Sequence, residues 1–349
     1  MDDFRAMKIQ SKSANGWLKH IGKLGFPVHF VLKLYQMTIV FWDLMFMGLM
    51  AYKEMWVTAI YTLVPIRKKK LENEVAVIVG SSRGLGRELA FKLASLDATV
   101  ICIDMQKSDQ ELTSKTVIDL GGSAYYYQCD VTQKEQVDKT ISEIINDVGN
   151  VTMLYTCCSL PSPRSVVTNP PSVRQTIDTS VTSYFYLLES ILPHMKAKCK
   201  GHLVFLTSVA AISGFTQQLA LSVSQFAIQG LYESVVEELR VAKLDRIIKT
   251  TLVHIYPFIL DRIIKTTLVH IYPFIVSENL ENDIRLRVPG FFGSIRADKA
   301  ADSIIDGVRK NKTEISIPKY CLLISHILKI FPRRITLMLR DFLDTGVDF

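Results

Sequence analysis

The chain has 349 residues, which is enough for one large α/β domain with additional segments. It is 48% hydrophobic and carries a formal net charge of +7 at pH 7, a sign that suits nucleic acid or anionic lipid as a partner. Because no zinc-finger spacing, basic helix or interleaving of aromatic and basic residues is present, we expect no nucleic-acid partner. The six cysteines form no CxxC unit and no secreted-type spacing, which favours free thiols in a reducing compartment and no metal site.

The N-terminal region predicts a membrane anchor. A basic tail over residues 1–25 precedes an apolar segment that begins at residue 26, and a basic flank ends at residue 70. Charges at Lys33, Asp43, Lys53 and Glu54 leave no uncharged run of the roughly 18 residues expected of a spanning helix. Basic residues on both sides favour keeping both ends cytosolic. The pattern predicts a helical hairpin or interfacial helix pair over 26–66; a single span and a hairpin packed on the domain are the alternatives.

A glycine-rich turn follows the first predicted strand, at 74–79, and leads into an amphipathic helix. Glycines in such a turn let backbone N–H groups approach a pyrophosphate at a helix N-terminus. The position of the turn between a strand and a helix makes this a specific signal for dinucleotide binding. The predicted cofactor contacts in the turn are Gly80, Ser82, Arg83, Gly84, Leu85 and Gly86.

An acidic residue, Asp104, ends the second predicted strand, about 20 residues beyond the glycines as expected for a ribose ligand. A carboxylate there accepts hydrogen bonds from ribose hydroxyls and repels a 2′-phosphate, which favours NAD over NADP. Arg83 points the other way, because a basic residue in the turn suits NADP. The alternative for Asp104 is a strand-end residue that caps the next turn.

These motifs, in this order, resemble the short-chain dehydrogenase/reductase family over residues 71–318. The flanks, with Pro65 before the run of basic residues and Pro318 near the other end, resemble its subgroup of membrane-associated retinol and 17β-hydroxysteroid dehydrogenases. The resemblance implies an α/β fold, a Rossmann-type doubly wound parallel sheet, as a single domain after an N-terminal membrane-associated helical segment. It also places Asp130 and Val131 on the adenine side of the cofactor. It further implies a lipid membrane, a lipophilic small molecule and a homo- or heterodimer as partners, with the domain facing the cytosol on endoplasmic reticulum or lipid droplets.

The catalytic positions of the family are mostly replaced. Ser208, in a predicted loop after a strand, matches the family's serine, whereas Ser180, Leu221 and Gln225 occupy the asparagine, tyrosine and lysine positions. The family's tyrosine acts as acid or base, and its pKa of about 10 must be lowered by a nearby cation. Leucine has no such proton and glutamine has no charge. None of the 13 tyrosines is followed by lysine four residues later, and Tyr184 and Tyr186 are the candidate substitutes.

Residues 244–259 are repeated without change at 260–275. The unit resembles the family's sixth strand, only one copy is needed, and the sequence does not say which copy forms it. A duplicated exon and an error in the gene sequence are both open explanations. Beyond it, the sequence predicts a helix at 297–310, a strand at 314–317 and a C-terminal amphipathic helix within 319–349, facing the membrane or the substrate pocket.

We therefore expect a membrane-associated protein of this family that binds NAD, with NADP the alternative, and that is catalytically impaired. A working NAD(P)-dependent oxidoreductase of retinol, steroids or other lipophilic alcohols is the first alternative. A lipid-binding module without a nucleotide is the second.

Overall fold

The computed structural model describes residues 26–63, 67–158, 173–211, 219–255, 284–285, 297–320, 323, 327 and 346–347. The chain divides into two compact units, Met1–Arg67 and Lys68–Phe349. The second unit contains the central sheet and the predicted cofactor residues, so it corresponds to the predicted α/β domain.

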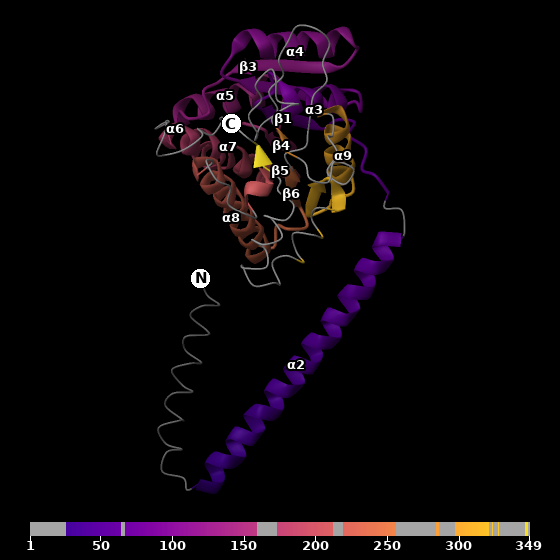
Figure 1. Cartoon of the computed structure of the whole chain (residues 1–349), viewed down its shortest axis with the longest axis vertical. Helices are drawn as coiled ribbons and strands as arrows, with labels where there is room; N and C mark the ends of the chain where they lie inside the picture. The colour runs from indigo at the N-terminus through magenta and orange to yellow at the C-terminus, as the bar shows by residue number, and fades with distance from the viewer. Residues whose placement is uncertain are drawn as a thin grey trace. The chain divides into compact units, whose positions relative to one another are not determined.

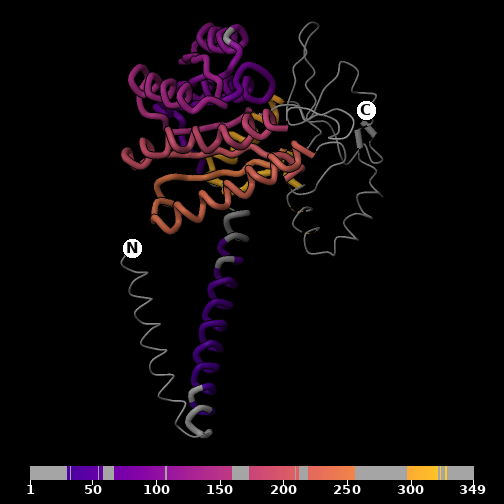
Figure 2. Tube along the Cα trace, turned by 90° about the vertical axis from the view of Figure 1, so that its left-hand side faces the viewer, coloured from indigo at the N-terminus to yellow at the C-terminus, as the bar shows by residue number. Residues whose placement is uncertain are grey.

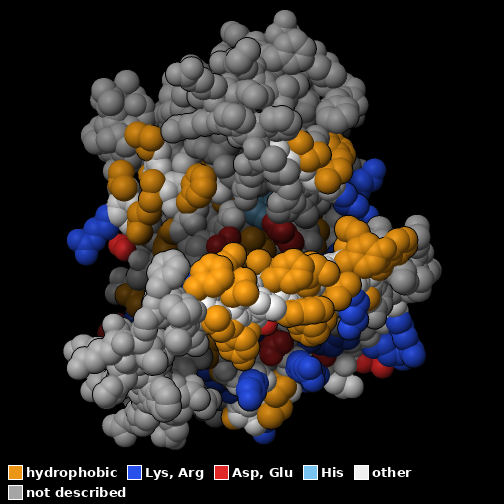
Figure 3. All heavy atoms as spheres, turned by 90° about the horizontal axis from the view of Figure 1, so that it is seen from below, with side chains coloured by type: hydrophobic (Ala, Val, Ile, Leu, Met, Phe, Trp, Pro, Cys, Tyr) orange, Lys and Arg blue, Asp and Glu red, His pale blue; other side chains and the backbone are white. Residues whose placement is uncertain are grey.

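A single helix, α2 (Phe26–Leu63), runs through the described part of the first unit without a break. The predicted return of the chain within 26–66 is therefore wrong. Charged residues do not interrupt backbone hydrogen bonding, and a single glycine such as Gly48 costs a helix only about 1 kcal/mol. Its described side chains are almost all apolar and exposed (Figure 3). Among the described residues, α2 is the one helix long and apolar enough to cross a bilayer, over Lys33–Val57, a criterion of length and composition that signal sequences also meet.

A seven-stranded parallel sheet with the order β3-β2-β1-β4-β5-β6-β8 forms the centre of the second unit. Its strands are β1 (Val75–Val79), β2 (Thr99–Asp104), β3 (Ser123–Gln128), β4 (Met153–Thr156), β5 (Gly201–Ser208), β6 (Ile248–Ile255) and β8 (Glu314–Ile317). The order reverses between β1 and β4, which makes the doubly wound arrangement predicted from the sequence. A separate antiparallel pair joins β7 (Ile284–Arg285) to β9 (Gly346–Val347).

Helices cover both faces of the sheet, as the nearly continuous apolar strands require. They are α3 (Gly84–Ala94), α4 (Lys107–Asp119), α5 (Lys134–Asp147), α6 (Val173–Ile177), α7 (Ser183–Ala197), α8 (Leu219–Val241) and α9 (Ala297–Arg309), with a π-helical turn η1 (Asp178–Thr182) and a 3₁₀ turn η2 (Val209–Ala211). Figure 1 shows α3 and α9 on one side and α5, α7 and α8 on the other, the side that Figure 2 faces. Alternate strand residues such as Ile78 and Val77 enter the two separate core clusters.

The first copy of the repeat forms β6, because residues 248–255 pair with β5 on one side and β8 on the other. The first copy follows α8 directly, and Leu244 N–H donates to the carbonyl of Leu239 at the end of that helix. The second copy lies outside the described residues, as does most of the predicted C-terminal helix. The predicted helix at 297–310 and strand at 314–317 are confirmed, the helix ending at Arg309.

Candidate functional site

A cavity of about 520 Å³ opens at the carboxyl ends of the strands, beside the point where the strand order reverses between β1 and β4. This is where open parallel sheets bind ligands. Of the predicted cofactor residues, Gly84 is not among those that line it, although it lies in the same turn. The others line it together: Gly80, Ser82, Arg83, Leu85, Gly86, Asp104, Asp130 and Val131.

The backbone of the glycine-rich turn lies close to the residues that follow β4, the strand beside β1 in the sheet. Gly80 has a φ of 82°, in the left-handed region, and an added Cβ would lie 3.0 Å from the backbone of Cys157 and Cys158. At Gly86 an added Cβ would lie 2.1 Å from the carbonyl oxygen of Gly80. The turn therefore needs glycine at both positions for its own closure, and the closed turn lines the cavity at the start of α3.

Asp104 lies at the end of β2 with its carboxylate on the turn. Its Oδ2 accepts from the backbone N–H of Ser82 at 3.2 Å, and its Oδ1 accepts from that of Gln106 at 3.3 Å. A carboxylate offers about four acceptor positions, so both oxygens can accept further hydrogen bonds from ligand hydroxyls. The carboxylate is thus positioned by the turn and faces the cavity.

Arg83 is held on the outer side of this carboxylate. Its Nη2 donates to Gln106 Oε1 at 3.0 Å, and its Nε lies 3.7 Å from an Asp109 carboxylate oxygen. Its guanidinium therefore already has a polar partner and an acidic neighbour. The side chain is 46% exposed, so it can still rearrange towards an anion at the cavity rim.

Asp130 stabilises its own loop. Its Oδ1 accepts from the backbone N–H of Thr132 at 3.0 Å and from the Thr132 hydroxyl at 2.7 Å. This local turn fixes Val131 at the cavity wall, where a flat apolar ring would pack. The adenine-side position that the resemblance implies for Asp130 and Val131 stays a prediction.

Two adjacent thiols follow β4. Cys157 and Cys158 both line the cavity, and the Cys158 thiol donates to the carbonyl of Thr179 at 3.6 Å. Burial raises the pKa of both thiols, that of Cys158 to about 11. Since the thiolate is the nucleophile and metal ligand, these cysteines act as small neutral side chains. Within the described ranges no cluster of His, Cys, Asp and Glu could hold a metal ion.

The glutamine at the lysine position is a structural acceptor. Gln225 Oε1 accepts from the backbone N–H of Ser208 at 2.9 Å and from the Thr207 hydroxyl at 3.1 Å. The side chain is buried, yet Gln225 also lines the cavity. An ammonium group in the same place would face the Ser208 N–H donor, so the site is built for an amide oxygen.

Ser208 is the last residue of β5 rather than part of the predicted loop. Its hydroxyl oxygen accepts from the backbone N–H of Ala210 at 3.1 Å, and the residue is fully buried. It is absent from the described cavity lining. The hydroxyl therefore contacts the turn η2, while the backbone N–H contacts Gln225.

Leu221 and Ser180 are buried at the remaining catalytic positions, and neither is among the described residues that line the cavity. Ser180 lies in the π-helical turn η1, and its hydroxyl has no hydrogen-bond partner within the described part of the chain. Such turns often occur at functional sites.

Neither candidate tyrosine is placed to substitute. The Tyr184 hydroxyl is buried against the carbonyls of Thr156 and Leu206, at 3.0 and 3.3 Å, and burial raises its pKa well above 10. The ring of Tyr186 lies under Lys134 of α5, 5.8 Å from its ammonium nitrogen. Neither residue appears among the described cavity residues.

Several residues that line the cavity were not predicted from the sequence, and three of them contribute polar side chains from α6, η1 and β5. Gln175 and Thr179 line the cavity from α6 and η1, and Thr207 lines it from β5. None belongs to a motif, so only the packing of η1 and α8 against the strand ends could reveal them.

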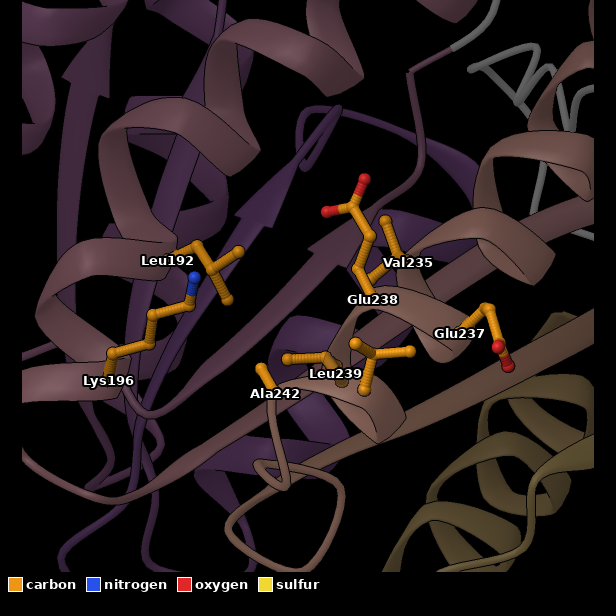
Figure 4. Close-up of a pocket in the computed structure, with 8 residues that line it drawn as sticks. Leu192, Lys196, Val235, Glu237, Glu238, Leu239 and Ala242 are labelled. Atoms are coloured by element: carbon orange, nitrogen blue, oxygen red, sulfur yellow. The ribbon is translucent and has the colours of Figure 1, made fainter. Parts of the chain in front are cut away.

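A second cavity of about 420 Å³ lies between α7 and α8, where Leu192 and Lys196 face Val235 and Leu239 (Figure 4).

Comparisons with known proteins agree with this fold. Residues 74–256 match the short chain dehydrogenase family. Human epidermal retinol dehydrogenase 2 is 26% identical over 286 residues, covering 81% of this chain and 86% of that protein. Human 17-beta-hydroxysteroid dehydrogenase 13 is 22% identical, covering 79% and 85%.

Solved structures share the fold. A metagenomic short-chain oxidoreductase in complex with NADP matches with a TM-score of 0.55 and 20% identity, over 71% of this chain and 96% of that one. A putative short-chain dehydrogenase/reductase from Burkholderia xenovorans matches with a TM-score of 0.58, 20% identity and the same coverage. The family match extends over more than half of the chain and contains the glycine-rich turn, Asp104 and β1 to β6. The chain belongs to the short chain dehydrogenase family.

Proposed function

We propose that this protein is a membrane-anchored member of the family that binds a nicotinamide dinucleotide and has lost proton-transfer catalysis. One observation carries the proposal: Leu221 and Gln225 occupy the tyrosine and lysine positions, and the Gln225 amide oxygen is committed to the end of β5. The cavity residues that would hold the adenosine and pyrophosphate are retained.

The loss of chemistry follows from the groups that remain. A bound nicotinamide ring would supply or accept a hydride, and a protein group must then exchange a proton with the substrate oxygen. Leu221 has no exchangeable proton, and Gln225 has no charge that could lower the pKa of a neighbour. Acid–base catalysis of this kind is worth about 10²- to 10⁴-fold in rate. Members of a catalytic unit fail together, so Ser208 alone restores little of it.

The proposed cofactor is NAD. The Asp104 carboxylate faces the cavity where the two ribose hydroxyls would lie, and its negative charge disfavours a 2′-phosphate. Arg83, the residue that would favour NADP, is hydrogen-bonded to Gln106 and lies near the Asp109 carboxylate. Replacing Asp104 with asparagine should therefore narrow the preference for NADH over NADPH.

The proposed location is the cytosolic face of endoplasmic reticulum or lipid droplets, with α2 as the anchor. Its exposed apolar side chains and the window Lys33–Val57 support insertion in a bilayer. The retinol and hydroxysteroid dehydrogenases among its relatives suggest a lipophilic alcohol or ketone as the ligand beside the cofactor.

The experiment measures NADH and NADPH binding and then turnover on the same full-length protein in detergent or vesicles. We expect saturable NADH binding, detected by NADH fluorescence, without oxidation or reduction of retinol or steroids. A Leu221→Tyr, Gln225→Lys double variant probes the substrate pocket in protein first shown to be folded, because a gain of turnover requires the rest of the site to be intact.

The second candidate is a working dehydrogenase of lipophilic alcohols, favoured by the names of the relatives. Turnover that is lost in Ser208→Ala would establish it and refute our proposal. Absence of NADH binding would instead indicate a lipid-binding module without a nucleotide.

A further inference from the structure

The edge of the sheet opposite the cofactor cavity is rich in basic residues. Because the sheet is parallel, the segments that precede its strands all lie at one edge. The segments before β1, β5, β6 and β8 carry Lys68, Lys69, Lys70, Lys198, Lys200, Lys243, Arg246, Lys310 and Lys312. β4, which lies between β1 and β5, is preceded by an uncharged segment, so no acidic loop interrupts the series.

Ion pairs bring these segments together in space. Lys69, before β1, and Lys200, before β5, both lie 2.9 Å from the same Glu74 oxygen. Lys68, before β1, and Lys310, before β8, both lie 2.6 Å from Asp306. The basic residues therefore belong to one surface, which we call the basic edge.

Four residues of the basic edge remain unneutralised. Lys198, Lys243, Arg246 and Lys312 are exposed, and none makes a salt bridge within the residues that the structure describes. By contrast, the described strand ends at the cavity carry two carboxylates, Asp104 and Asp130, against Arg83. Among the described residues, basic side chains without a salt bridge are therefore present at the amino edge, whereas the cavity lining carries more acidic than basic residues.

We propose that the basic edge docks on the anionic phospholipid surface of the membrane in which α2 is anchored. The chain enters this edge at Lys68, only five residues after Leu63 ends α2, a span of at most about 18 Å. Each lysine or arginine close to an anionic leaflet strengthens partitioning by about fivefold. The inference rests on the proposed function in one respect: the α2 anchor brings the domain close to lipid. The charge of the basic edge then determines which face of the domain meets the membrane.

This orientation has a consequence for the cofactor. The strand β5 has eight residues, so the cavity at its other end lies about 26 Å from the docked edge. The dinucleotide would then exchange with the aqueous phase, and its affinity would not depend on the charge of the lipid.

Cys199 provides the probe. It is exposed and lies between Lys198 and Lys200, while Cys102 and Cys129 are buried and Cys157 and Cys158 line the cavity. Full-length protein is reconstituted on vesicles of phosphatidylcholine, with or without phosphatidylserine, and flotation records whether it is bound. The rate of labelling by a membrane-impermeant maleimide is then measured, with Cys199→Ser as the background.

We expect labelling of Cys199 to be slowed at least severalfold by phosphatidylserine, and the effect to disappear at high salt. A Lys198→Glu, Arg246→Glu, Lys312→Glu variant changes one residue in each of three segments and should lose the protection. A Lys115→Glu, Lys139→Glu, Lys299→Glu variant has the same net charge with changes on α4, α5 and the first turn of α9, and should keep it.

The two proposals fail in different ways. Protein that does not float with neutral vesicles refutes the α2 anchor, whereas the docking face is judged by the phosphatidylserine-dependent protection alone. Equal labelling on both vesicles, or equal loss of protection in both variants, would overturn the basic edge as a docking surface.

Discussion

Replacing Gln225 with leucine tests whether its amide holds the end of β5. Leucine keeps most of the buried volume and removes the oxygen that accepts from the Ser208 N–H at 2.9 Å and the Thr207 hydroxyl at 3.1 Å. The Thr207 hydroxyl keeps another acceptor, the main-chain carbonyl of residue 225 at 3.4 Å. The Ser208 N–H is therefore the donor left without a partner.

A buried donor without an acceptor costs about 1–3 kcal/mol. For a domain of this size each kcal/mol lowers Tm by about 2–4 °C. We expect Gln225→Leu to lower the free energy of unfolding by this amount. Gln225→Lys should cost at least as much, because its ammonium group is a donor placed against the same N–H.

Urea unfolding of the full-length variants, followed by circular dichroism, measures the difference. Tryptophan fluorescence is unsuited to it, since Trp17, Trp42 and Trp56 all precede the α/β domain. Gln229→Leu, four residues along the same helix, is the control. Among the described residues the Gln229 Nε2 donates to Glu233 on that helix and the Oε1 has no partner, so its effect should stay within about 0.5 kcal/mol. A Gln225→Leu variant as stable as this control would refute the structural role of the amide.

Three further predictions concern the edges of the sheet. Burial alone would raise the pKa of Glu74, but hydrogen bonds and charge from two lysines and Thr152 outweigh it and hold that pKa below 4.5. Glu74→Gln should therefore lower the free energy of unfolding by about 1–3 kcal/mol at pH 7, and this difference should shrink as pH falls below 4.5. Paired urea titrations measure it, and no difference at pH 7 would show that the carboxylate is unpaired. Burial lowers the pKa of His202 to about 3, so its NMR signal should not titrate between pH 5 and 8, and a normal titration would contradict its burial. Because the unfolded chain takes up this proton near pH 6.5 and the folded protein does not, His202 should reduce stability as pH falls below about 6.5. Gly86→Ala, whose Cβ would lie 2.1 Å from the Gly80 carbonyl oxygen, should weaken NADH binding about tenfold or more by fluorescence titration, and unchanged affinity would show that the turn can rearrange.

The proposed loss of catalysis and the proposed docking face concern opposite edges of one sheet. At the carboxyl edge, Leu221 and Gln225 stand at the positions where the resemblance places the family's tyrosine and lysine. At the amino edge, lysines are in excess over the acids that pair with them. The two edges can therefore be tested independently, one by turnover and the other by lipid charge.

Local patterns determined much of this protein from the sequence alone. The resemblance carried by the ordered motifs implied the doubly wound sheet. The apolar strands are consistent with it, because a parallel strand buried on both faces needs a continuous apolar run. The glycines at 80 and 86 and the acid at 104 marked the cavity, since their backbone freedom and charge act at fixed distances along one βαβ unit. The predicted hairpin over 26–66 is wrong, because charged residues influence how a segment inserts in a membrane but do not interrupt a helix.

Tertiary structure decided what depends on residues far apart in the chain. The two copies of the repeat are identical, so only pairing with β5 and β8 assigned the first copy to β6. The sequence showed that Gln225 is not a lysine, but its contacts with Ser208 and Thr207 make it an acceptor for the strand end. Lysines separated by more than a hundred residues share one carboxylate because parallel strands place their leading segments at the same edge. Such convergence is a property of the sheet, which no single stretch of sequence contains.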